Sequence, residues 1–532
     1  MTYTSLNYLL FVAACLLVYG ICPKKFRWGV LLCASLGFYA IVCLKYISFI
    51  LLTGFTTYGG GIWLGRYITK SDAFVKSQKG KWSKEEKSAY KDKATRNKKL
   101  IVTAILLLNF GILAFLKYYN FFADSLNVIL KHFGGTLPKL GLFLPLGISF
   151  YTFQSMGYII DIYRKKVTPE RNPLKLLLFV SFFPQIVQGP IAFYNDLSGQ
   201  LYEGKDPTFE NFKQGILLIT WGFFKKLIIA DRLVAAVNIV APDYQKYSGT
   251  LILMTALIYA LQLYADFSGG IDISRGVAQL YGINMAENFK RPYFSRDISE
   301  YWHRWHITLG AWLREYLFYP IAMSKLFQNF SKKLKKRFGM KAAKVVPVSI
   351  ASLITFLVVG VWHGANWKYV AFGFWNGGII MISTLLADNF KSWKAKLHIK
   401  DTNKGFILFQ MIRTFFIVLV GYYFDIATDF TSAVKMMWRS VTDVKISEFL
   451  SAATYKMLTV SKREFLLVAL AGIALFVVSV LQERSKFTLR ERICKKGYIV
   501  ECLVFMVLFW SVVVFGVYGP GTSPADFYYM QF

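Results

Sequence analysis

Apolar runs long enough to cross a membrane follow one another along most of the 532-residue chain. A transmembrane helix needs roughly 18 or more predominantly apolar residues. We place such runs at residues 5–21, 28–43, 46–64, 100–117, 142–162, 174–195, 212–230, 249–270, 346–362, 367–387, 405–425, 464–482 and 498–518. The pattern predicts an all-α polytopic protein, multi-pass in the plasma membrane, with about 11–13 transmembrane or re-entrant helices.

One run is interrupted in a way that suggests a re-entrant segment. Residues 182–193, FFPQIVQGPIAF, contain two prolines and a glycine inside apolar sequence. Non-helical backbone at membrane depth is tolerated only where it is buried in protein or lines a cavity. We therefore expect this segment to break its helix.

Composition agrees with a membrane protein, because only 17% of the residues are charged, against about 25% in soluble proteins. The net charge of +33 could indicate nucleic-acid binding or basic cytoplasmic connections. Basic residues stand in short blocks between the apolar runs, which favours basic cytoplasmic connections. We therefore expect no nucleic-acid partner. We expect a Lys-rich cytoplasmic loop at 66–99 and a basic loop at 325–344. A basic inner face would also attract anionic lipid and polyanionic substrates.

Polar and ionisable residues gather between Asp266 and His363, and such residues in apolar surroundings suggest a functional site. The segment EYWHRWHITLGAWLREYLFYP, residues 300–320, holds two of the five histidines, His303 and His306. If it is helical, the two imidazoles share a face. One interpretation is a metal site, although the pattern is not HExxH and no third ligand is evident. The other is a set of interfacial aromatic residues with hydrogen-bonded histidines.

His363 ends an apolar run in the motif WHG, beside Gly364. A neutral imidazole can act as a general base there, while a capping or pore-lining histidine is the alternative. The chain has no G-x-S-x-G elbow, phosphate-binding loop or dinucleotide fingerprint. A base without a resident nucleophile suggests that an external hydroxyl attacks an activated donor. Its six cysteines show no zinc-ligand spacing, so we expect no metal.

Six motifs follow one another along the chain: PLGISFYTFQSMGYIIDIYR at 145–164, FFPQIVQGPI at 182–191, FFKKLIIADRL at 223–233, YADFSGGIDISRGVAQLYGINMAENFKRPY at 264–293, YWHRWHITLGAWLREYLFYP at 301–320 and WHGANW at 362–367. In this order they resemble the membrane-bound O-acyltransferase (MBOAT) family, in its bacterial alginate O-acetyltransferase-like branch. The resemblance implies one membrane domain over 1–532 around a central tunnel. Its catalytic core motifs lie at 264–376, and an extracytoplasmic tail covers 519–532. After Leu317 the chain reads FYPIAMSK where relatives often read YIPLGG, which affects any partner docking nearby.

By motif, His363 matches the principal catalytic histidine of the family and His306 its second key polar position, whereas His303 is not carried over. The resemblance implies a cytoplasmic thioester donor, acetyl-CoA, no permanently bound cofactor, and an extracytoplasmic hydroxyl on an exported polysaccharide or cell-wall polymer. Surrounding lipid and a partner extracytoplasmic acyltransferase are also implied. D-alanyl transfer to teichoic acid is the nearest alternative. Lys225 and Lys226 could meet donor phosphates, and we expect further substrate contacts from Trp305, Arg304, Arg314, Asn288, Arg291 and Asn366.

A transporter or flippase and a membrane scaffold are the alternatives of other classes. A transporter predicts two matching halves with polar residues spread over both. The polar residues lie in one region instead. A scaffold predicts that substitution of His363 leaves function intact.

Overall fold

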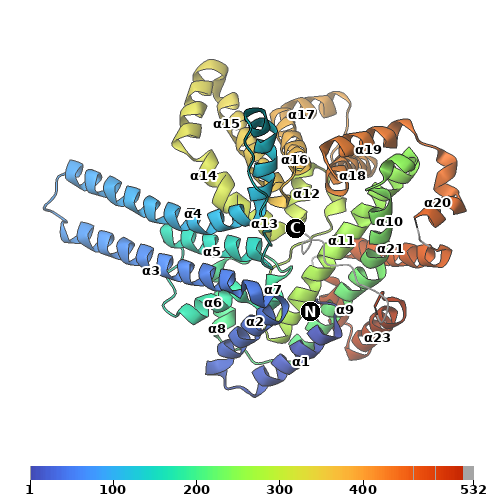
Figure 1. Ribbon diagram of the computed structural model, residues 1–532, viewed down its shortest axis with the longest axis horizontal. Helices are drawn as coiled ribbons and strands as arrows, with labels where there is room; N and C mark the ends of the chain where they lie inside the picture. Colours follow the sequence, from blue (N-terminus) through green and yellow to red (C-terminus); the bar gives the residue numbers. More distant parts are fainter. Residues whose placement is uncertain (1, 459–460, 486, 519–532) are drawn as a thin grey trace. The chain divides into compact units, whose positions relative to one another are not determined.

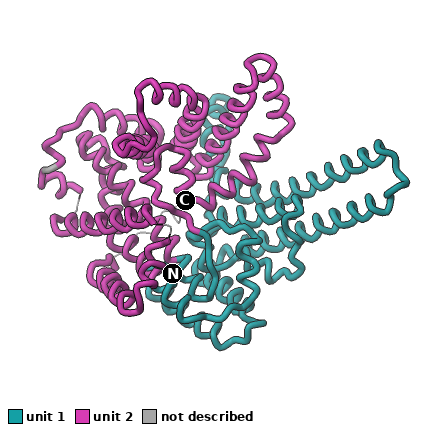
Figure 2. The backbone as a smooth tube through the Cα atoms, turned by 180° about the vertical axis from the view of Figure 1, so that it is seen from behind, with its two compact units in different colours: residues 1–216, 274–286 teal, residues 217–273, 287–532 magenta. Residues whose placement is uncertain are grey.

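The computed structural model describes residues 2–458, 461–485 and 487–518, and these are helical without a regular strand. Backbone contacts divide the chain into two compact units, 1–216 with 274–286 and 217–273 with 287–532 (Figure 2). The sequence predicts one domain over 1–532. The boundaries between the two units fall inside helices α9 (Phe209–Phe223) and α11 (Gly249–Leu280), and after residue 286. The expected tail at 519–532 lies outside the described residues.

The first unit contains the long helices α3 (Ile47–Ser77) and α4 (Lys84–Leu130), which run side by side (Figure 1). The other helices of this unit are α1 (Leu6–Ile21), α2 (Arg27–Cys43), α5 (Ile148–Tyr163), α6 (Pro173–Ser181), α7 (Phe183–Ile186) and α8 (Tyr194–Tyr202). The expected break in the run 174–195 is confirmed, because α6 ends at Ser181 and no helix follows α7 until Tyr194.

The prediction of a loop at 66–99 is wrong. Helix α3 continues to Ser77, and α4 already begins at Lys84. Ser83 caps α4 by accepting from the Glu86 backbone N–H at 3.1 Å, and the Glu86 carboxylate accepts from the Ser83 N–H at 2.8 Å. This capping box starts the helix well before the apolar run, so the Lys-rich sequence extends two helices instead of forming a loop.

The second unit contains most of the remaining helices. They are α10 (Asp231–Val240), α12 (Ile298–Arg304), α13 (Ile307–Leu313), α14 (Tyr319–Ala322), α15 (Lys325–His363), α16 (Trp367–Leu385), α17 (Ala387–Lys396), α18 (Lys404–Ile426), α19 (Phe430–Thr442), α20 (Ala452–Met457), α21 (Lys462–Glu483), α22 (Leu489–Cys494) and α23 (Tyr498–Phe515). The basic segment 325–344, expected as a loop, is the start of α15, which is kinked at Gly339 where φ is +83°.

Seven helices of the described residues are long and apolar enough to cross a membrane, or eight with the bent pair α16–α17. The expected 11–13 included re-entrant segments, whereas this count treats residues 24–77, which hold two predicted runs, as one helix and leaves out shorter helices such as α1. Five predicted runs lie within about two residues of the observed bounds: α1, α2, α16, α18 and α21. The all-α polytopic architecture is confirmed.

Buried charges join two elements of the second unit. Lys226 lies in a π-helical turn, Phe224–Ala230, and is 1% exposed. Its Nζ lies 2.5 Å from Asp266 of α11 and 2.9 Å from Asp231. The neighbouring Lys225 contacts Asp272 at 2.7 Å. Both lysines are therefore held by carboxylates inside the unit, where they tie helices together, and they do not present free charge to a donor phosphate.

We expect Lys226→Met to destabilise the protein by about 3–5 kcal/mol, because it leaves two carboxylates buried without their cation. Thermal unfolding in detergent measures the loss. Lys246→Met is the matched control, since Lys246 pairs with Asp243 on the surface and such pairs contribute little. Equal melting temperatures for the two variants would contradict a stabilising role for the buried cluster.

Candidate active site

The helix break at Trp305 and His306 positions the first of the two imidazoles predicted to form the site. Helix α12 ends at Arg304, and α13 begins at Ile307. His306 lies between them with φ +47°, in the left-handed region that non-glycine residues rarely adopt. Such a conformation costs about 1–3 kcal/mol and persists only where surrounding contacts enforce it, as they do at many functional sites.

The contacts that enforce this break come from the segment 288–290. The Ile307 N–H donates to the Asn288 carbonyl at 3.0 Å, and the Lys290 N–H donates to the Arg304 carbonyl at 2.9 Å. Between these bonds, Phe289 and Trp305 form an isolated antiparallel β-bridge. The chain around His306 is thus held in an extended turn by a segment 16 to 18 residues earlier.

The Asn288 side chain completes this arrangement. Its Oδ1 accepts from the Thr308 N–H at 2.9 Å and from the Thr308 hydroxyl at 2.8 Å, and lies 3.4 Å from His306 Nδ1. These contacts fix which end of the amide is oxygen. Asn288 is 1% exposed, and its Nδ2 has no hydrogen-bond partner among the described residues. A buried amide donor in this state can bind an electron-rich group of a substrate.

The His306 ring is buried among aromatic side chains. It packs edge-on against Phe267 with ring centroids 4.9 Å apart, and lies 6.1 Å from Trp362. Desolvation, followed by the positive charge that His363 can carry, lowers the pKa of His306 to about 3. The imidazole is therefore neutral throughout the physiological range.

The other histidine of the motif has a different environment. His303 is exposed, and its Nδ1 bonds to the carbonyl of Ser299 one helical turn earlier at 2.6 Å. Because the helix breaks at Trp305, the shared helical face assumed for His303 and His306 does not form. A metal site on that face would have depended on this continuity.

His363 is the last residue of α15, where its position depends on close packing against α16. A Cβ on Gly360 would lie 2.2 Å from the Tyr369 carbonyl, and one on Gly373 would lie 2.4 Å from that of Phe356. Small residues let the two helix backbones approach closely. The His363 ring consequently contacts Phe372 and Tyr369, with centroids 4.9 Å and 6.1 Å away.

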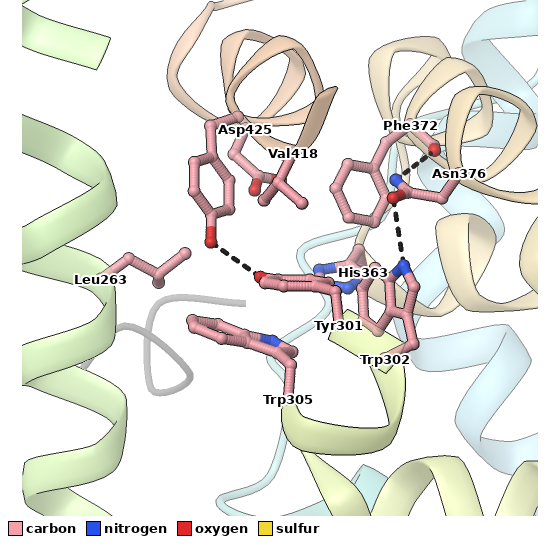
Figure 3. Close-up of a pocket in the computed structure, with 10 residues that line it drawn as sticks. Leu263, Tyr301, Trp302, Trp305, His363, Phe372, Asn376, Val418 and Asp425 are labelled. Carbon is pink, nitrogen blue, oxygen red and sulfur yellow. Dashed lines mark hydrogen bonds between the residues drawn. The ribbon is translucent and has the colours of Figure 1, made fainter. Parts of the chain in front are cut away.

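A small cavity adjoins His363 (Figure 3). Its volume of about 10 Å³ is roughly what one water molecule requires. Trp302 donates from Nε1 to the Asn376 amide oxygen at 3.1 Å, and the Tyr301 and Tyr422 hydroxyls are 2.8 Å apart. The complete lining is Leu263, Tyr301, Trp302, Trp305, His363, Phe372, Asn376, Val418, Tyr422 and Asp425. The cavity therefore offers an imidazole and several polar groups to a single water or hydroxyl.

Comparison with known proteins shows which family this chain belongs to. The family model for the membrane-bound O-acyltransferase family matches residues 169–334. A probable alginate O-acetylase of Azotobacter vinelandii is 32% identical over 380 residues, which are 71% of this chain and 67% of that protein. The chain belongs to the membrane-bound O-acyltransferase family. Within it, the similarity supports the alginate O-acetyltransferase-like branch.

Two further relatives of this O-acyltransferase have names that refer to other polymers. A peptidoglycan O-acetyltransferase of Helicobacter pylori is 30% identical over 378 residues, 66% of this chain and 62% of that protein. A teichoic acid D-alanyltransferase of Bacillus subtilis is 31% identical over 294 residues, 54% and 69% of the two chains. The matches to the alginate and peptidoglycan relatives span about two thirds of those proteins' length.

The basic residues predicted to bind substrate in this O-acyltransferase lie outside the cavity at His363. Glu483, the last residue of α21, accepts from both Arg291 and Arg304, at 2.5 Å and 2.9 Å. Arg304 also contacts Glu300 at 2.7 Å. These pairs anchor the two sides of the bridged segment. Arg314 is exposed on the π-helical turn that follows α13.

Asn366 is an N-cap, because its side chain accepts from the Lys368 N–H at 3.0 Å at the start of α16. The structure thus brings together His306, Asn288, Trp305 and His363, and places Arg291, Arg314 and Asn366 elsewhere. Sequence reasoning did not select Tyr301, Trp302, Tyr422 or Asp425 as site residues. Asp425 offered the clearest signal, as an acid inside the apolar run 405–425.

We expect Gly364→Ala to disturb His363, because a Cβ there would lie 2.3 Å from the Tyr369 ring that stacks on the imidazole. Overpacking of this kind costs about 1–3 kcal/mol. Gly378→Ala on α16 is the control, since its Cβ would meet nothing within 4 Å. Thermal unfolding and acyl transfer of both variants provide the comparison. Wild-type behaviour of Gly364→Ala would show that the ring contact is unimportant.

Burial of neutral His306 also predicts a pH dependence of stability. In the unfolded chain His306 binds a proton below about pH 6.5. In the folded chain it stays neutral until the pH approaches its lowered pKa of about 3. The free energy of unfolding should therefore fall by up to about 1.4 kcal/mol per pH unit as pH decreases below 6.5. His306→Gln should remove this component of the slope in unfolding measured between pH 7 and pH 5. Identical slopes for the variant and the wild type would contradict the buried neutral state.

Proposed function

We propose that this membrane-bound O-acyltransferase moves an acetyl group from acetyl-CoA, approaching from the cytoplasm, to a hydroxyl of an exported polysaccharide or cell-wall polymer. The observation that carries the proposal is the arrangement of His306, Asn288 and His363 around the aromatic centre of one compact unit. An imidazole at His363 that can act as a base and a buried amide donor at Asn288 suit direct attack by an external hydroxyl.

In the proposed reaction the acceptor hydroxyl attacks the carbonyl carbon of the thioester while His363 takes its proton. A C–O bond forms, the C–S bond breaks, and the departing thiolate takes the proton back from His363. Asn288 donates from Nδ2 to the carbonyl oxygen as negative charge develops on it. His306 bonds through Nδ1 to Asn288 Oδ1 and so positions that amide.

The access routes form part of the proposal. Basic segments at 66–99, 325–344 and 391–404 are placed in the cytoplasm by the excess of Lys and Arg in cytoplasmic connections. Arg314 lies outside the cavity at His363, and because it is exposed it is the predicted substrate contact best suited to meet donor phosphates from that side. The turn after His363 then faces outward. Support for a polymer acceptor comes from the polymers in the names of the relatives. We further propose that an extracytoplasmic partner transferase passes the acetyl group to that polymer.

We expect His363→Ala to lower acetyl transfer by about 10²–10⁴-fold, the contribution typical of a general base. Asn288→Ala should lower it by about 10²–10³-fold as an oxyanion donor is lost. Membranes containing each variant are supplied with radiolabelled acetyl-CoA, and label is followed into polymer. His303→Gln is the matched control and should retain wild-type transfer, because His303 is exposed away from the cavity.

The same assay distinguishes the competing functions. Wild-type rates in correctly folded His363→Ala would contradict the proposed base and favour a scaffold. Label transferred from a D-alanyl thioester and not from acetyl-CoA would favour D-alanylation, to which the Bacillus subtilis relative is assigned by name. Absence of transfer from either donor in the presence of acceptor would favour a transporter or flippase.

A further inference from the structure

A second cavity lies within the same compact unit, between α11, α18, α21 and the turn at 292–294. Its volume is about 450 Å³, within the range of about 300–1,000 Å³ that binding sites for small molecules occupy. Leu261 and Tyr264 of α11, Phe415 of α18 and Gly472 and Leu475 of α21 line it. The lining is almost entirely apolar, so the cavity favours a hydrocarbon chain over a sugar or nucleotide.

The mouth of this cavity is formed by exposed apolar residues on two spans. Leu408, Ile412 and Phe416 of α18 and Phe476 of α21 are each about half exposed. Both helices are long and apolar enough to cross the membrane. In a bilayer the medium outside such residues is lipid acyl chain, so lipid tails have direct access to the cavity.

The cavity has one charged residue in its lining, Arg291. Its Nε donates to Glu483 at 2.5 Å, and its two terminal nitrogens make no hydrogen bond within the described ranges. Its backbone is also in the left-handed region, with φ +49°. A guanidinium with free terminal N–H groups at the end of an apolar cavity is complementary to a phosphate attached to a hydrocarbon chain.

We propose that this cavity binds one anionic membrane phospholipid, with an acyl chain between α11, α18 and α21 and its phosphate at Arg291. The site is separate from the cavity at His363. It also does not require acyl transfer, because its occupant is a component of the surrounding membrane.

The lipid site shares a wall with the catalytic cavity. Tyr293 lines the lipid site, and its hydroxyl donates to the Ala260 carbonyl at 2.6 Å. The same hydroxyl lies 3.0 Å from that of Tyr422, which is 2.8 Å from that of Tyr301. Tyr422 and Tyr301 line the cavity at His363. A bound acyl chain therefore packs against the residues that hold the catalytic wall in place.

Lipid retention tests the proposal. Protein is reconstituted into nanodiscs of equal parts phosphatidylglycerol and phosphatidylcholine and returned to detergent, and the remaining lipid is counted by native mass spectrometry. Wild type should retain one phosphatidylglycerol. Gly472→Leu should lose it, because the new side chain fills the cavity while its Cβ meets only Leu261 at 3.6 Å. Ala474→Leu adds similar bulk on the same helix outside the cavity and should keep the lipid.

The head-group assignment has its own variant. Arg291→Gln should reduce the preference for phosphatidylglycerol over phosphatidylcholine about tenfold, because both lipids carry the phosphate but only phosphatidylglycerol has a net negative charge that the guanidinium attracts. Equal retention by Gly472→Leu and wild type would overturn the cavity assignment. An unchanged preference in Arg291→Gln would overturn the phosphate contact. If Gly472→Leu does not fold, Ile412→Trp at the exposed mouth provides the same test.

Discussion

The hydrogen bonds between Asn288 and residues 306–308 are the interaction on which the site depends. One amide oxygen accepts from two groups of Thr308 and faces His306, and the Asn288 carbonyl accepts from Ile307. Without these bonds the segment 301–313 would have no reason to leave a continuous helix, and the left-handed conformation of His306 would lose its support. The same residue then presents its buried amide nitrogen, which has no partner in the described part of the chain, next to the imidazole it has positioned.

Close helix packing supplies the other half of the site. Gly360 and Gly373 let α15 and α16 approach until no side chain fits between their backbones. This places His363, at the end of α15, beside Phe372 and Asn376 of α16. Glu483 of α21 holds Arg304 next to Trp305 and, through Arg291, the opposite strand of the bridge. The geometry of the candidate site is therefore a property of helices far apart in sequence that pack within one unit.

Sequence patterns could predict those features that depend on local composition. The bounds of α18 follow from an apolar run that begins just after its N-cap, Asn403, and the first helical residue, Lys404. The prolines of 182–193 predicted a broken helix. The pairing of His306 with His363 came from motif resemblance, since 57 residues separate them and no local rule connects them.

The features that the sequence did not reveal are those created by long-range contacts or by helix formation in polar sequence. The break at His306 needs the bridge to Phe289, and the cavity walls formed by Asn376 and Tyr422 need α16 and α18 to be packed. Hydropathy alone treats the Lys-rich segment 66–99 as a loop. Lysine, glutamate and alanine are nevertheless good helix formers, and the cap at Ser83 lets α4 start in polar sequence.

A structure of the protein with a non-hydrolysable acetyl-CoA analogue tests the central claim most directly. The account predicts that the acyl carbonyl oxygen lies within hydrogen-bonding distance of Asn288 Nδ2. It also predicts that the carbonyl carbon faces the water-sized cavity beside His363. An acyl group bound away from both residues, with Asn288 Nδ2 still unbonded, would contradict it.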